Sequence, residues 1–181
     1  MFNNLASLIP YLVLFSHFAL LFIFLALISR KSFGAPVYNF VAKHALVLAL
    51  VVSVVSVIGS LFYSEIIGFE PCVLCWWQRV FLYPLVVIFS IALWKKLDSA
   101  FLYAVPLALL AGFFALYHAF GAMGGAALLP CLAEGGECSK VYVKAFGYIT
   151  IPVMSITISL FILLLAWANK IYRNENSNTQ R

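Results

Sequence analysis

The sequence predicts an all-α integral membrane protein, a four-helix transmembrane bundle with one extra N-terminal transmembrane helix. Hydrophobic residues make up 65% of the 181-residue chain and charged residues 9%, and the mean hydropathy is +1.07. A soluble domain carries about 25% charged residues, so this chain has too little polar surface to face water. Runs of about 20 apolar residues are long enough to cross a bilayer. Five such runs occur, at Leu8–Ile28, Ala45–Tyr63, Trp77–Trp94, Phe101–Phe120 and Tyr148–Ala168.

The first apolar run is expected to be a retained helix that enters from outside. A signal peptide carries positive charge before its apolar core, whereas here the basic pair Arg30-Lys31 follows the run. His17, the strongly titratable residue of this run, is expected to be a buried, neutral, hydrogen-bonded side chain. Residues 1–43 therefore form the extra helix and a short link, residues 44–170 the four-helix bundle, and residues 171–181 a disordered cytoplasmic tail.

Basic residues predict the orientation of the five spans. Eight of the 11 lysines and arginines fall in alternate connections and at the carboxyl end, which the positive-inside rule assigns to the cytoplasm. This places the amino terminus and the connections 64–76 and 121–147 outside a bacterial cytoplasmic membrane. The excess of positive charge then needs no nucleic acid to explain it. The eight residues are Arg30, Lys31, Lys43, Lys95, Lys96, Lys170, Arg173 and Arg181.

A C-x-x-C pair, Cys72 and Cys75, lies where the third apolar run begins. The unpaired N–H groups and the positive dipole end of a helix N-terminus stabilise an anion, which favours the reactive thiolate. Arg79 lies four residues beyond Cys75, so that its guanidinium and the sulfur share a helix face. The motif alone is also used by zinc and iron–sulfur sites. Its setting favours a redox cysteine pair at a membrane surface.

The other two cysteines, Cys131 and Cys138, lie in the second outward connection. Disulfides form and persist outside the cytoplasm, and six intervening residues with two glycines let the two sulfurs meet. A bridge on such a loop closes little chain, which favours an exchanging rather than a stabilising role. His118, near the outer end of the fourth run, is predicted at the depth of Arg79 and is a further candidate for the site.

The stretch Pro71-Cys72-Val73-Leu74-Cys75 with Gln78-Arg79, followed by a second outward cysteine pair, resembles the DsbB/BdbC disulfide bond formation family. The similarity covers roughly residues 44–170 and includes the segment 146–152 at the entry to the last helix. The chain departs from the family in its extra first helix. The short spacing of the loop cysteines resembles the BdbC-type members.

The resemblance implies a protein-dithiol:quinone oxidoreductase that reoxidises a DsbA-like thioredoxin-fold thiol oxidase. It implies the disulfides Cys72–Cys75 and Cys131–Cys138, with all four cysteines catalytic. The partner would attack the loop bridge, and the reduced loop would then attack Cys72–Cys75 and leave Cys75 as a thiolate. Arg79 and His118 would bind the cofactor, a quinone (ubiquinone or menaquinone), and no metal is expected.

Three alternatives remain open at this stage. Four cysteines suit one structural zinc site, of which C-x-x-C forms half. A vitamin K epoxide reductase-like protein performs the same chemistry, but there the loop cysteines precede the C-x-x-C motif. A structural membrane protein could carry passive disulfides.

Overall fold

The computed structural model describes residues 2–97, 99–123 and 140–179, and it is helical throughout apart from connections and an isolated bridge between Ala145 and Ile149. Five of its helices are long and apolar enough to span a membrane, which confirms the predicted fold class. The elements are α1 (Phe2–Ile28), α2 (Ala35–Lys43), α3 (Ala45–Leu61), the π-helical turn η1 (Phe62–Ile66), α4 (Val73–Lys95), α5 (Ala100–Ala122) and α6 (Ile151–Thr179).

Helices α3 to α6 pack as a bundle whose centre is lined by small residues. Ala104, Ala108, Ala111 and Ala115 of α5 are fully buried and recur at intervals of three and four residues, so they form one stripe along the helix. Small side chains let helix backbones approach closely in a membrane. This stripe explains why α5 packs against both α4 and α6.

The segment between α1 and α3 differs from the short link that the sequence predicted, because part of it forms the helix α2. Pro36 lies in its first turn, where a missing N–H group costs no hydrogen bond. Tyr38, Val41 and Ala42 are buried, and α2 packs against α6. Their spacing of three and one is that of a single helix face, so burial of this face stabilises a helix too short to be stable alone.

The last helix also continues beyond the predicted boundary of a disordered tail, through Thr179. Glu175 on its final turns accepts a hydrogen bond of 2.8 Å from the Tyr38 hydroxyl and lies 3.4 Å from Nε of Arg30. Burial and this hydrogen bond raise the pKa of Tyr38 above its ordinary value. These contacts join the end of α6 to the segment that follows α1, and they stabilise the polar last turns of α6 as helix.

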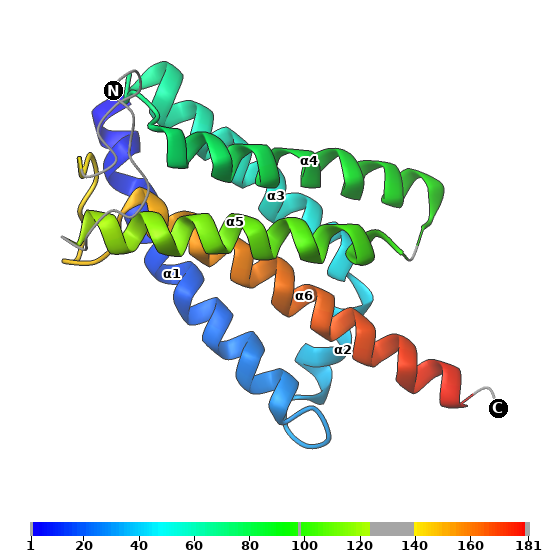
Figure 1. Cartoon of the computed structure of the whole chain (residues 1–181). Helices are drawn as coiled ribbons and strands as arrows, with labels where there is room; N and C mark the ends of the chain where they lie inside the picture. Colours follow the sequence, from blue (N-terminus) through cyan, green and yellow to red (C-terminus); the bar gives the residue numbers. More distant parts are fainter. Residues whose placement is uncertain (1, 98, 124–139, 180–181) are drawn as a thin grey trace.

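The extra helix α1 packs against α2 and α6 (Figure 1). His17 fixes its rotation, because Nε2 lies 2.8 Å from the Thr157 hydroxyl and Nδ1 lies 3.2 Å from the Tyr148 hydroxyl. Thr157 already donates its own proton to the Val153 carbonyl at 2.9 Å. The Nε2 of His17 must therefore donate to Thr157, which leaves Nδ1 to accept from Tyr148.

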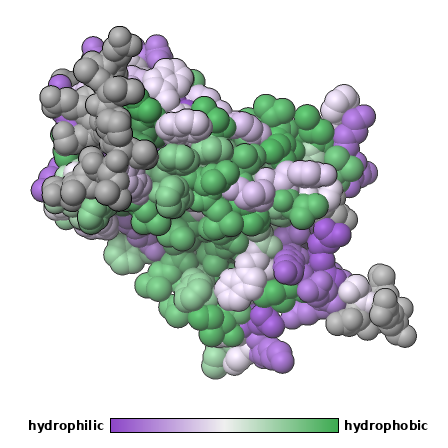
Figure 2. All heavy atoms as spheres, in the orientation of Figure 1, coloured by the Kyte–Doolittle hydropathy of each residue, from purple (hydrophilic) through white to green (hydrophobic). Residues whose placement is uncertain are grey.

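Apolar side chains cover the middle of the molecule, and hydrophilic residues gather toward the ends of the helices (Figure 2). The beginnings of α1, α4 and α6 and the end of α5 lie at one end of the bundle, opposite the carboxyl terminus (Figure 1). The C-x-x-C pair therefore shares this end with His118.

Candidate redox site

The two described cysteines flank the first turn of α4. Cys72 is the N-cap residue, with an extended backbone (φ −72°, ψ 170°), and α4 begins at Val73, earlier than the apolar run predicted. The Cys72 carbonyl accepts the first helical hydrogen bond, from the Trp76 N–H at 3.1 Å. The structure shows no disulfide between these two residues, and their Sγ atoms lie 3.4 Å apart. The structure thus shows the dithiol form of this pair, with the sulfurs close enough to bond after a small rotation.

The two cysteines differ in exposure, and the proton affinity of Cys72 is raised. Cys72 is buried and Cys75 is half-buried. The hydrogen bond to Cys75 and then burial raise the pKa of the Cys72 thiol to about 11, although a hydrogen bond from His118 acts in the opposite direction. At neutral pH Cys72 is therefore held as a thiol, despite its position at a helix N-terminus.

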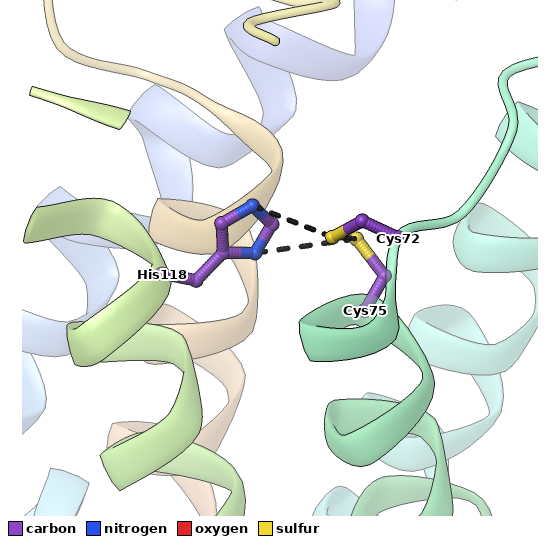
Figure 3. A group of neighbouring side chains, drawn as sticks. All are labelled: Cys72, Cys75 and His118. Carbon is purple, nitrogen blue, oxygen red and sulfur yellow. Dashed lines mark hydrogen bonds between the residues drawn. The ribbon is translucent and has the colours of Figure 1, made fainter. Parts of the chain in front are cut away.

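His118 on α5 points directly at the cysteine pair (Figure 3). Its Nε2 lies 3.8 Å from Sγ of Cys72 and its Nδ1 lies 4.0 Å from Sγ of Cys75. The side chain is only 5% exposed. The sequence predicted His118 as a cofactor ligand at the depth of Arg79, whereas the structure places it in contact with the sulfurs. It can therefore act on the thiols as well as line the cavity described below.

Gln78 is a site residue that the sequence analysis quoted only as part of a motif. Its amide Nε2 lies 3.1 Å from Nδ1 of His118, and the side chain is buried. The signal was present in the sequence, because Leu74, Gln78 and Leu82 recur every four residues and so share the inward face of α4. An amide on such a face needs a hydrogen-bonding partner. With Gln78 donating to Nδ1, the neutral imidazole carries its proton on Nε2 and presents it to Cys72.

Arg79 is held by the neighbouring helix α3. Its Nε donates to the Ser60 hydroxyl at 3.0 Å and its Nη2 donates to the Ser60 carbonyl at 3.3 Å. The guanidinium carbon lies 5.2 Å from the Trp76 ring centre, within cation–π range. Tyr83 also donates to the Ser60 hydroxyl, at 3.1 Å. The sequence predicted Arg79 from its spacing to Cys75, whereas Ser60 and Tyr83 were not among the predicted site residues.

A cavity of about 560 Å³ opens beside these residues, within the range of small-molecule sites. Cys72, Cys75, Gln78, Arg79 and His118 lie along it. Most of the remaining lining is apolar and comes from α1, α3 and α6. A flat ring with polar carbonyls and a hydrocarbon tail fits this chemistry, since Arg79 offers donors at one end and aliphatic side chains surround the rest.

The same residues could instead hold a metal ion when the thiols are reduced. The Sγ atoms of Cys72 and Cys75 and a ring nitrogen of His118 all lie within 4.8 Å of one another. Two thiolates and an imidazole are a ligand set that zinc accepts. The four-cysteine zinc site considered above involves Cys131 and Cys138, and these two residues and their predicted bridge lie outside the described residues.

The fold and the site together define a multi-pass membrane protein with a C-x-x-C pair at one end of its helix bundle. The sequence model of the family "Disulfide bond formation protein DsbB" matches residues 42–169. The chain therefore belongs to the DsbB family, whose members act in disulfide bond formation. This finding confirms the resemblance seen in the sequence, and the match leaves out most of the extra helix region.

Curated relatives agree with this assignment. The chain is 36% identical over 116 residues to the disulfide bond formation protein C of Bacillus subtilis, which covers 63% of this chain and 83% of the relative. It is 39% identical over 113 residues to the SPbeta prophage-derived disulfide bond formation protein B of the same species, which covers 62% of this chain and 76% of the relative. No solved structure gives a significant match.

Proposed function

We propose that this protein is a protein-dithiol:quinone oxidoreductase that reoxidises a DsbA-like thioredoxin-fold thiol oxidase outside the cytoplasm. The observation that carries the proposal is the contact between a C-x-x-C dithiol and a buried histidine at the wall of a largely apolar cavity that also contains Arg79. The DsbB family assignment supports the disulfide chemistry. The cavity supports a lipid-soluble electron acceptor.

The proposed relay consists of thiol–disulfide exchanges. A partner thiolate attacks the Cys131–Cys138 bridge, and the partner leaves as a disulfide while the loop pair becomes a dithiol. Cys138 then attacks Sγ of Cys72 in the Cys72–Cys75 disulfide, which releases Cys75 as a thiolate. Cys131 resolves the mixed disulfide, so the loop bridge re-forms and Cys72 and Cys75 are reduced. The described dithiol is the state that this step produces.

His118 is suited to manage the proton of Cys72 in this relay. Its Nε2–H faces Sγ of Cys72, so it stabilises the thiolate when that sulfur leaves. When the disulfide re-forms, the Cys72 thiol must lose its proton. Nε2 accepts this proton in the other neutral tautomer, in which Nδ1–H donates to the Gln78 amide oxygen after the amide has turned over. Because the pKa of Cys72 is raised to about 11, the thiol needs such a base at neutral pH.

A quinone, when bound, supplies the acceptor for the two electrons and two protons that leave the Cys72–Cys75 dithiol. Arg79 lies at the cavity wall with its guanidinium oriented by Ser60, and it is placed to donate to a carbonyl oxygen on which negative charge builds. Whether this acceptor is ubiquinone or menaquinone depends on the membrane that contains the protein.

We further propose that the chain divides into the extra helix and link (1–43) and the redox bundle (44–170). The amino terminus and the cysteine-bearing end face outward, and the carboxyl terminus lies in the cytoplasm of a bacterium. The distribution of basic residues supports this orientation. Alkylation of single-cysteine variants by a membrane-impermeant maleimide in intact spheroplasts tests it. Labelling of Cys72 or Cys131 only after lysis would contradict it.

The purified protein tests the proposed reaction. With a reduced thioredoxin-fold donor, it should convert quinone to quinol in equal amount to the donor disulfide formed, and Cys72→Ser should abolish this conversion. A donor that stays reduced in the presence of any quinone would refute the proposal. Denaturing mass measurement with alkylation separates the structural zinc alternative, since a zinc site predicts four free thiols in the resting protein and a relay predicts few or none.

A further inference from the structure

The cavity beside the cysteines does not end at the four-helix bundle. Ile9, Leu12, Val13 and Ser16 of the extra helix α1 form part of its wall. The same cavity is lined by residues of α3, such as Val55, and of α6, such as Ile158 and Phe161. The helix α1, which lies wholly outside the family match, therefore completes the cavity that contains the redox site.

This part of the cavity is open toward the apolar surface. Leu12 of α1 is 67% exposed, and Val55 and Ile58 of α3 are 63% and 61% exposed, although all three line the cavity. They belong to helices that are apolar enough to span the membrane. An opening framed by such residues faces lipid rather than water. It connects the hydrocarbon of the bilayer with Arg79, Cys75 and His118.

Two polar side chains along this path, Ser16 and Thr157, already have hydrogen-bonding partners. The Ser16 hydroxyl donates to the Val13 carbonyl at 2.7 Å, and the Thr157 hydroxyl donates to the Val153 carbonyl at 2.9 Å while accepting from His17. Most of the other side chains that α1, α3 and α6 contribute to the path are apolar. That environment suits a hydrocarbon chain and does not suit a polar ring.

We infer that α1 and α3 form a lateral entrance for a lipid-soluble acceptor and that its hydrocarbon tail lies along the Leu12–Ser16 face of α1. The extra helix is then a specificity element, which favours long-tailed over short-tailed acceptors. This inference rests on the proposed quinone reduction for its physiological meaning, but tail binding can be measured without turnover.

The test compares two acceptors with the same ring, one with a long isoprenoid tail and one with a single isoprene unit. Ser16→Phe places a ring in the path. We expect it to weaken binding of the long-tailed acceptor about tenfold and binding of the short-tailed one less than about twofold. Binding is measured by quenching of tryptophan fluorescence, and KM should change by the same factors.

The matched control is Leu21→Phe, on the same helix at a position 55% exposed that does not line the cavity. It should leave both acceptors unaffected. If Ser16→Phe weakened binding of both acceptors equally, or of neither, the inference would be overturned. Either result would indicate that a lipid chain or nothing occupies this path. If the wild-type protein binds the long-tailed acceptor more tightly but never reduces it, the proposed function fails and the tail site stands.

Discussion

The Nε2 atom of His118 lies 3.8 Å from Sγ of Cys72, although 46 residues separate the two in the chain. The contact crosses from the end of α5 to the first turn of α4, and Gln78 holds the other ring nitrogen at 3.1 Å. A base and a thiol are thus fixed together in a buried site. The relationship makes the histidine part of the sulfur chemistry rather than only of cofactor binding.

Replacement of His118 should slow the steps that move the Cys72 proton. General acid–base groups contribute about 100-fold or more, so His118→Asn should lower the single-turnover rate of Cys72–Cys75 reoxidation by about that factor. Rapid mixing of the reduced protein with excess quinone, followed by acid quench and alkylation, measures this rate. Ala119→Ser, at the neighbouring position, serves as control. An unchanged rate in His118→Asn would show that another group takes the proton.

Arg79 should contribute to acceptor binding and to stabilising the negative charge that builds on the acceptor. Ser60 should contribute indirectly, by holding Arg79 in place. Arg79→Lys keeps the charge but loses the planar fork that bonds both Ser60 oxygens, so quinone reduction should fall about tenfold or more with folding retained. Ser60→Ala should give a smaller loss of the same kind, because the Ser60 carbonyl still accepts one bond. Steady-state kcat and KM for quinone, with circular dichroism as a folding check, measure both. Wild-type turnover in Arg79→Lys would exclude the assignment.

The Cys72 thiol should react slowly with alkylating agents until strongly alkaline pH. A pKa raised from 9.0 to about 11 lowers the thiolate fraction at neutral pH about 100-fold. Cys75→Ala removes the largest cause of the shift and should lower the apparent pKa of Cys72. The reduced protein is alkylated briefly at a series of pH values, and mass spectrometry then measures the alkylated fraction of Cys72 separately from that of the other cysteines. A Cys72 midpoint below 9 would contradict the geometry described here.

The same shift has a consequence for stability in the reduced protein. Since the folded state keeps the Cys72 proton more firmly than the unfolded state does, this thiol contributes most stability below pH 9 and loses its contribution as the pH rises toward 11. Thermal unfolding of the reduced protein between pH 8 and 11 should therefore show a decline that Cys72→Ala lessens. An equal decline in both proteins would assign the loss to other groups.

His17 should hold α1 against α6. His17→Phe removes the hydrogen bonds to Thr157 and Tyr148, and such bonds are worth about 0.6 kcal/mol each on average in a membrane bundle. The variant should unfold about 1 kcal/mol more easily, as measured by steric trapping in bicelles, with the sulfur chemistry retained. Phe18→Leu, at an exposed position of the same helix, is the control. Equal stability of the two variants would show that apolar packing alone docks α1.

Much of the architecture follows from sequence because a bilayer limits what a chain can do. An apolar run of about 20 residues must satisfy its backbone internally and so forms a spanning helix, which predicted all five long helices and put Cys75 at a helix N-terminus. The sequence also predicted how deep in the membrane a side chain lies, because the position of a residue along a spanning helix sets its distance from the membrane surface. His118 and Arg79 were expected at one depth on that ground, and both line one cavity.

Only the tertiary structure decided which side chains at that depth face one another. Rotation about each helix axis depends on packing, such as the alanine stripe of α5, and the apolar runs carry little record of it because they are apolar on all faces. The structure thus turned His118 toward the sulfurs, joined Arg79 to Ser60, and packed α1 on α6 through His17. Length and hydropathy determined the spans, and side-chain contacts between helices determined the site.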